Sequence, residues 1–338
     1  MTFRVPAGNG TRAPRRRWVV TTTAAAGVAG LAAASLASRP DRPVAPGLTT
    51  PGPVTTVLLP LAELVAMLAA LLTVGALLVV LLTRRPDGRL DQAAPRYLAV
   101  ASRAAAVWAV AALLGTLLRA SDIAGRPVLD VLTGGRLLEY LWLLPPTRTA
   151  LAAALCALVV AVAARRVAGP DGVVLLLAVT GSGLALPVFT GHAATAGNHT
   201  LAVGALLVHV AGVAAWVGGL AGLALLLTGD ARRLGVALPR FTTVATVAFV
   251  AVGLSGTLSA VTRLSALDDL WRTPYGWLVL AKVVALVVLG VLGWRFRRAV
   301  VGSAHRVRAQ FTRLAGGELV LMAVTVGLAV ALSRTPTP

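Results

Sequence analysis

Repeated apolar runs of about 20 residues are the feature that most constrains this sequence, because a run of that length spans a bilayer as a helix. Nine such runs lie along the chain, at residues 18–37, 54–83, 97–118, 147–164, 172–190, 201–228, 241–262, 275–294 and 314–333. The whole chain is 57% hydrophobic and 13% charged, with a mean hydropathy of +0.84, whereas about a quarter of the residues in soluble domains are charged. The sequence therefore predicts an all-α, polytopic transmembrane helix bundle.

The first apolar run leaves two alternatives open. It follows the basic stretch TRAPRRRW and ends in AASLAS, so it is either a first span or a signal peptide with a small-residue cleavage site. The chain then has nine spans, or eight after cleavage. Both alternatives start the second span on the outer side.

The arginines indicate the orientation of the bundle. With a cytoplasmic amino terminus, 20 arginines fall on the cytoplasmic side and 9 on the outer side, as the positive-inside rule requires. The net charge of +19 therefore reflects membrane orientation, and no motif of a nucleic-acid-binding protein accompanies it. The lone Cys156 excludes an intrachain disulfide and a cysteine metal cluster. We expect a multi-pass protein of the cytoplasmic membrane, with the lipid bilayer as its surroundings and no nucleic-acid partner.

The chain divides into three parts: a basic tail with the first span or signal (1–37), an amino-terminal membrane region (38–189) and a carboxyl-terminal membrane domain (190–338). Two outer connections are long. Residues 119–146 contain LDVLTGGRLLEYLWLLPP, which predicts a short interfacial helix or a re-entrant piece. Residues 263–274 contain Trp271, which we expect to anchor at the membrane interface.

Five ionisable residues lie inside predicted spans, where each is costly and points to function. They are Glu63, Arg103, His209, Lys282 and Glu318. Counted from the ends of their spans, Glu63, His209 and Lys282 fall in the outer half of the membrane, about 10–14 Å deep. We expect these three to line one polar cavity that is reached from outside. Arg103 and Glu318 fall in the inner half.

Three of the four histidines are close together in the stretch GHAATAGNHTLAVGALLVHVAGVAAWVGGL. His192 and His199 belong to an uncharged outer loop, and His209 lies inside the following span. Because neutral imidazole suits copper among other metals, we take these three as candidate metal ligands. The alternatives are two solvated loop histidines and an interhelical hydrogen bond of His209.

His209 shares a helix face with Gly212, Trp216 and Gly219, since steps of three, four and three keep to one side. The glycines would let another helix or a flat ligand approach the imidazole closely. Met67, one turn below Glu63, is a candidate deeper thioether ligand, although methionines in spans are more often packing residues. No ATP-binding P-loop occurs, so transport by this chain is not driven directly by ATP.

Four blocks resemble a known family: LLVHVAGVAAWVGGL, RFTTVATVAFVAVGLSGTLSAVTRL, TPYGWLVLAKVVALVVLGVLGW and GELVLMAVTVGLAVALS. They are similar to the CopD family of copper-resistance and copper-import membrane proteins, including the YcnJ type and the CopD half of actinobacterial fusions with a CtaG-type oxidase assembly half. The resemblance covers residues 190–333. It implies copper handling, with roles for His192, His209, Trp216, Lys282 and Glu318.

The resemblance implies a non-enzymatic function: copper uptake across the cytoplasmic membrane, contributing to copper homeostasis or resistance. It also implies two partners, a CopC-like extracytoplasmic copper-binding protein and a CtaG-type assembly factor. A scaffold that delivers copper to cytochrome oxidase is one alternative. Another is a haem b oxidoreductase, since the histidine before WVGGL and a later lysine also resemble HemJ-type proteins. In that alternative His209 is the axial ligand, and Lys282 lies near a propionate or is the sixth ligand.

Overall fold

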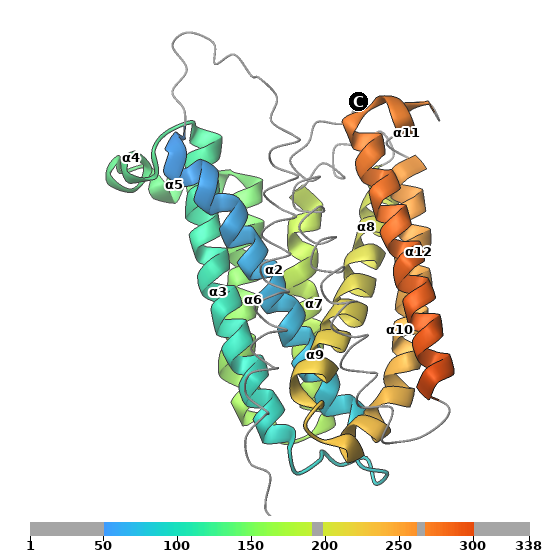
Figure 1. Cartoon of the computed structure of the whole chain (residues 1–338). Helices are drawn as coiled ribbons and strands as arrows, with labels where there is room; N and C mark the ends of the chain where they lie inside the picture. The colour runs from blue at the N-terminus through green and yellow to red at the C-terminus, as the bar shows by residue number, and fades with distance from the viewer. Residues whose placement is uncertain (1–50, 191–198, 262–267, 301–338) are drawn as a thin grey trace, which may run out of the picture.

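The computed structural model describes residues 51–190, 199–261 and 268–300, and these residues form helices without a strand (Figure 1). The long helices run up and down between two ends of a bundle. The elements are α2 (Gly52–Leu82), α3 (Ala94–Ala124), α4 (Val128–Thr133), α5 (Leu137–Leu143), α6 (Pro145–Ala163), η1 (Ala164–Arg166), α7 (Pro170–Ala185), η2 (Leu186–Thr190), α8 (His199–Val213), η4 (Ala214–Gly218), α9 (Gly219–Leu226), α10 (Ala231–Val261), α11 (Asp269–Arg272) and α12 (Pro274–Val300).

Six helical stretches within the described residues are long and apolar enough to cross a membrane. They are Gly52–Leu82, Ala94–Ala124, Pro145–Arg166, Pro170–Thr190, Thr200–Leu226 and Ala231–Val261. The predicted run at 275–294 is also helical, as α12, with an apolar core at Val279–Gly293. The predicted runs at 18–37 and 314–333 lie outside the described residues. The all-helical, multi-pass bundle is thus confirmed in its coarse form.

Connections alternate between the two ends of the bundle. We call the end with residues 83–93, 167–169 and 227–230 the inner end, since the sequence assigns it to the cytoplasm, and the opposite end the outer end. At the outer end, α3 stops at Gly125, whose φ of 61° is left-handed, a conformation that glycine adopts without a Cβ clash. The short helices α4 and α5 follow, within the stretch 119–146 for which the sequence predicts a short interfacial helix or a re-entrant piece.

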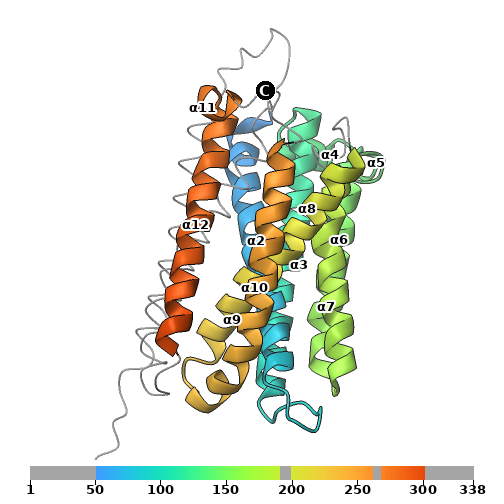
Figure 2. The same cartoon turned by 90° about the vertical axis from the view of Figure 1, so that its right-hand side faces the viewer.

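The centre of the bundle is α2, which packs against α3, α7, η4 and α9. Its buried residues in the inner half, among them Leu77 and Val80, join a hydrophobic core with Leu223 on α9 and Leu234 on α10. Figures 1 and 2 both place α12 at the edge of the bundle, next to α10. The amino-terminal helices therefore form the body against which the carboxyl-terminal helices pack.

The contact between α2 and the η4–α9 segment brings backbone against backbone. A Cβ added to Gly75 would overlap the carbonyl oxygen of Gly218, and one added to Gly222 would overlap the carbonyl oxygen of Gly75. A Cβ on Gly218 would lie 2.5 Å from the carbonyl oxygen of Leu71. Small residues permit such close approach between membrane helices. The glycines therefore join the two segments tightly.

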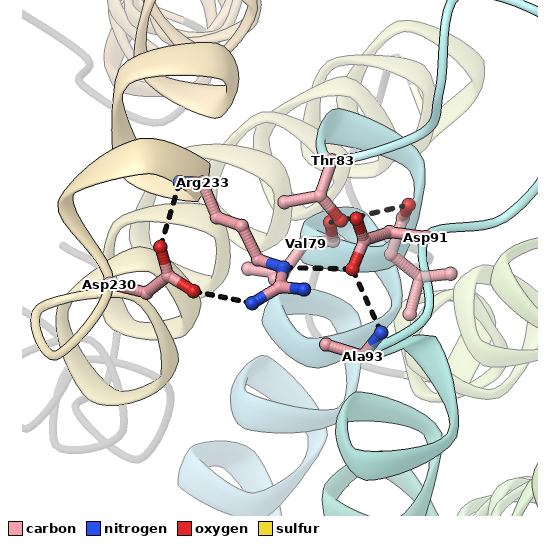
Figure 3. Close-up of polar contacts among 7 residues, drawn as sticks. Val79, Thr83, Asp91, Ala93, Asp230 and Arg233 are labelled. Atoms are coloured by element: carbon pink, nitrogen blue, oxygen red, sulfur yellow. Dashed lines mark hydrogen bonds and ion pairs between the residues drawn. The ribbon is translucent and has the colours of Figure 1, made fainter.

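The inner end is also held by ion pairs between two loops that are far apart in sequence (Figure 3). Arg233 Nε donates to Asp91 Oδ1 at 2.8 Å, and its Nη1 pairs with Asp230. Arg240 reaches the same region, where its Nη1 donates to the carbonyl oxygens of Leu82 at 2.8 Å and of Arg84 at 3.0 Å. We call Asp91, Asp230 and Arg233 the inner clamp.

Helix α10 begins about ten residues before the predicted apolar run at 241. Its first turns carry Arg232, Arg233 and Arg240, and it passes through Pro239. A hydropathy pattern detects only the part of a helix that lies in hydrocarbon, whereas these arginines extend the helix beyond it. This extension is what brings Arg233 to the inner clamp.

Candidate functional site

His209 on α8 is partly buried and faces α10, where its Nδ1 lies 3.2 Å from Ser255 Oγ. The interhelical hydrogen bond that the sequence offered as an alternative is therefore present. Ser255 is itself buried and belongs to α10. The two side chains come from antiparallel neighbours, since α8 descends from the outer end and α10 returns to it (Figures 1 and 2).

The hydrogen bonds of Ser255 fix which imidazole nitrogen carries the proton. Ser255 Oγ lies 2.5 Å from the carbonyl oxygen of Ala251, to which it can only donate. A hydroxyl has one proton and further lone pairs, so Ser255 donates to Ala251 and accepts from His209. Nδ1 then carries the hydrogen and Nε2 keeps a lone pair. We assign this tautomer from the network.

This arrangement is the usual one for a histidine that binds a metal. In such sites the nitrogen that does not bind the metal donates to a neighbouring oxygen, which orients the ring. Ser255 supplies that oxygen for His209. Gly256 leaves room beside the ring, because a Cβ there would lie 3.7 Å from His209 Cε1. The site thus provides an oriented nitrogen donor inside the membrane.

Lys282 on α12 lies near enough to His209 for its positive charge to act on the imidazole. Two of the three groups that the sequence grouped in one outer cavity are therefore electrostatic neighbours. The third, Glu63, forms an ion pair with Arg119 on α3, with Nη2 and Oε1 2.5 Å apart.

Arg119 was missed as a candidate because it follows the predicted run 97–118 and was counted as an outer-loop residue. In the structure α3 continues to Ala124, so Arg119 is still helical and meets Glu63 on α2. Its Nε is buried without a hydrogen-bond partner among the described residues. The signal was present in the sequence, since a glutamate inside a span needs a cation from a neighbouring helix.

The face that His209 shares with Gly212 and Trp216 is present in the structure, and α10 packs against it. Gly212 lies against Val252 and Ala248, and Gly219 lies against Phe241. Trp216 is buried and meets Phe249 edge to face, with ring centroids 5.3 Å apart. All these partners belong to α10. Of the two uses predicted for the glycines, the structure shows helix packing, and α10 fills the side on which a flat ligand would approach.

A π-helical turn, η4, follows α8 at Ala214–Gly218 and contains Trp216. Sequence periodicity did not predict it. The wider turn inserts a residue relative to a regular α-helix, and such turns are frequent at functional sites. Here it lets Trp216 face α10 while Gly218 faces α2.

The candidate histidines cannot all bind one ion. His199 is the first residue of α8 and His209 the eleventh, so their backbones are separated by about 15 Å along the helix axis. Imidazole–metal bonds are about 2 Å long, which is too short to bridge that separation. Within the described residues no group of three His, Cys, Asp or Glu side chains is placed to hold a metal. His199 and His209 therefore cannot share one ion, and only successive sites along α8 fit the geometry. His192 lies outside the described residues.

The remaining candidates fall in different places. Met67 is partly buried against Leu64, Leu71 and Ala214, which is a packing position near η4. Arg103, which the sequence places in the inner half of its span, is exposed on α3, so its side chain lies on the outer surface of the bundle. Glu318 lies outside the described residues.

Comparison with known proteins finds a matching family. Residues 235–332 match the family described as copper resistance protein D, or CopD. This stretch includes most of α10 and all of α12, which carry Ser255 and Lys282. The carboxyl-terminal part of this chain is therefore similar to CopD proteins. His209 lies before the matched stretch and is hydrogen-bonded to it.

Curated proteins are similar to this chain over part of their length. The chain is 30% identical over 160 residues to the copper transport protein CutJ of Bacillus subtilis, an alignment that covers 44% of this chain and 29% of CutJ. It is 31% identical over 190 residues to the uncharacterized protein Mb0105 of Mycobacterium bovis and to the uncharacterized protein MT0111 of Mycobacterium tuberculosis, covering 56% of this chain and 29% of each relative. The chain thus spans less than a third of these relatives. No solved structure matches it.

Proposed function

We propose that this chain moves copper ions across the cytoplasmic membrane and that His209 Nε2 is the copper ligand within the bundle. The observation that supports this best is the hydrogen bond from His209 to Ser255, which leaves one imidazole nitrogen with its lone pair. The CopD match of the helix that carries Ser255 supports copper as the ion, and the similarity to CutJ supports transport.

The direction we propose is uptake from the outer end. Copper would meet His192 and His199 first, delivered by a CopC-like partner, and would then pass to His209. Lys282 lies near this position, and its charge opposes tight retention of a cation, which favours onward movement. In the described conformation the inner end is joined by the inner clamp and by the Gly75 contact, so release inward requires these helices to separate. The chain is a carrier in this proposal and catalyses no reaction.

Copper uptake into vesicles tests the proposal. The full chain is reconstituted, copper is added outside, and intravesicular copper is counted by mass spectrometry. We expect His209→Ala to remove uptake and His209→Gln to do the same, since an amide does not replace the imidazole donor. Thr257→Ala is the matched control, because Thr257 is an exposed hydroxyl on α10 two residues from Ser255. Unchanged uptake in both His209 variants would contradict the proposal.

An absorption spectrum of the purified protein separates copper transport from the haem alternative. A copper carrier gives bound copper without a Soret band. A Soret band that disappears in His209→Ala would replace the copper proposal with a haem protein.

A further inference from the structure

Arg103 is an arginine on the surface of a membrane-spanning helix. It lies nine residues from the first residue of α3, Ala94, and its side chain is exposed. With 31 residues, α3 is about 46 Å long, which exceeds the ~30 Å hydrocarbon core of a bilayer and leaves both ends outside it. Arg103 therefore lies close to the inner edge of the apolar layer, from which a long side chain can reach the headgroups.

Two further arginines are close to Arg103. Arg96 precedes it by seven residues and is exposed on the same side of α3, about 10 Å nearer the inner end. Arg165 in η1 is also exposed, and its Nε donates to Ser102 Oγ at 3.2 Å, which fixes it beside the residue that precedes Arg103. Ser102 in turn donates to the carbonyl oxygen of Ala161 at 2.6 Å. We call Arg96, Arg103 and Arg165 the basic patch.

No acidic side chain balances these three charges within the described part of the chain. Neither an ion pair nor a hydrogen bond of the Arg103 side chain is formed there. The nearest acidic loop residue in sequence, Asp91, is engaged by Arg233. An unbalanced positive charge at the edge of hydrocarbon is unfavourable without an anion beside it. The lipid headgroup layer is where such an anion is available.

We propose that the basic patch binds the headgroup of an anionic phospholipid in the leaflet at the inner end. Guanidinium groups pair with phosphate oxygens through two parallel hydrogen bonds, and the three arginines of α3 and η1 are exposed at the same end of the bundle. The acyl chains would lie along the exposed apolar residues of α3 that continue the same side, Val107, Val110 and Leu114. The site is independent of the copper path and does not rest on the transport proposal.

Lipid binding is measured on the full chain in detergent by native mass spectrometry, with phosphatidylglycerol as the probe and phosphatidylcholine of the same acyl chains as the neutral comparison. We expect preferential binding of phosphatidylglycerol. Arg103→Gln should weaken it about fivefold, and the double variant Arg96→Gln with Arg103→Gln about 25-fold, as expected for arginines at a membrane surface. Arg103→Lys should lose less, because the charge is kept.

Arg89→Gln is the matched control, since it removes the same charge from an exposed loop at the same end. Equal weakening by Arg89→Gln, or equal binding of the two lipids by the unchanged protein, would overturn the proposal. Melting temperatures provide a second measurement. We expect phosphatidylglycerol to raise the Tm of the unchanged protein more than that of Arg103→Gln, with equal values in lipid-free detergent. A lower lipid-free Tm for Arg103→Gln would instead indicate an ion pair within the chain.

Discussion

The inner and outer parts of the helix bundle are built from different contacts. In the inner half, Gly75 on α2 meets Gly218 and Gly222 backbone to backbone, and the inner clamp joins the α2–α3 loop to the start of α10. In the outer half, α8 and α10 meet through His209 and Ser255, and α2 and α3 meet through Glu63 and Arg119. One half is held by tight packing and loop charges, and the other contains ionisable groups at the depth of the membrane.

The two halves therefore contribute to different properties: the inner contacts to folding stability, and the outer ionisable groups to metal binding. A glycine contact without space for a methyl group gives no donor to an ion, but it fixes the distance between two helices. A histidine with a free lone pair contributes little packing, but it can bind a metal. We therefore expect substitutions in the inner half to change folding stability, and substitutions around His209 to change copper binding with the fold retained.

Gly75→Ala should have the largest effect. The added methyl group must push α9 away from α2, and overpacking of this kind typically costs about 1–3 kcal/mol, with more expected where backbone is the obstacle. The Tm in detergent, measured by intrinsic fluorescence, should fall by several degrees or the protein should fail to accumulate. Gly204→Ala on α8 is the control, because a Cβ there meets nothing within 4 Å. Equal Tm values for the two variants would show that the close contact at Gly75 does not stabilise the inner half.

Ser255→Ala should come next, and its effect should be on copper. Without the hydroxyl, the imidazole loses the acceptor that orients it, and loss of such a partner typically weakens metal affinity about 10–100-fold. Copper binding by the purified protein, followed by competition with a calibrated chelator, measures this. Thr257→Ala should leave the affinity unchanged. A Ser255→Ala variant with normal affinity but a strongly lowered Tm would make Ser255 a packing residue.

Lys282→Met should strengthen copper binding, whereas Ser255→Ala should weaken it. At an effective dielectric constant near 20, a like charge in the neighbourhood of a bound cation contributes repulsion on the order of 1 kcal/mol, so its removal should tighten copper binding about tenfold. The same chelator competition gives the affinity, and the vesicle assay should show slower release. Weaker copper binding in Lys282→Met would show that the lysine assists the site.

Acid should weaken the inner clamp. Burial raises the pKa of Asp91, but the Ala93 amide and the Arg233 guanidinium outweigh burial and hold the pKa below its usual value. The Arg233 backbone amide lowers the pKa of Asp230 in the same way. A carboxyl with a lowered folded-state pKa stabilises the fold above its unfolded pKa and loses that contribution as the pH falls through the folded value.

We therefore expect Asp91→Asn to be less stable than the unchanged protein at pH 7 by about 1 kcal/mol, since the pair is partly exposed to solvent. The difference should close as the pH falls below about 4, where aspartates become protonated. Tm values recorded from pH 3 to pH 7 check this. A constant difference across that range would mean that the aspartate acts through packing.

The sequence predicted the helices well and their contacts poorly. Each apolar run within the described residues is a helix, and a short helix follows α3 as expected. Glu63, His209 and Lys282 were found because charge inside an apolar run is visible locally. Their partners Arg119 and Ser255 were not found, because the sequence shows that Glu63 and His209 need partners but does not show which helix supplies them. The π-helical turn at Ala214–Gly218 also has no local signature.

The amino-acid sequence alone determined that the chain is a helical membrane protein and that Glu63, His209 and Lys282 lie within apolar runs, because both depend on hydropathy along one segment. Only the tertiary structure decided that Glu63 pairs with Arg119, that His209 keeps its Nε2 lone pair, and that Asp91 meets Arg233. These are pairings between helices, and they depend on how two segments pack, which neither segment specifies by itself.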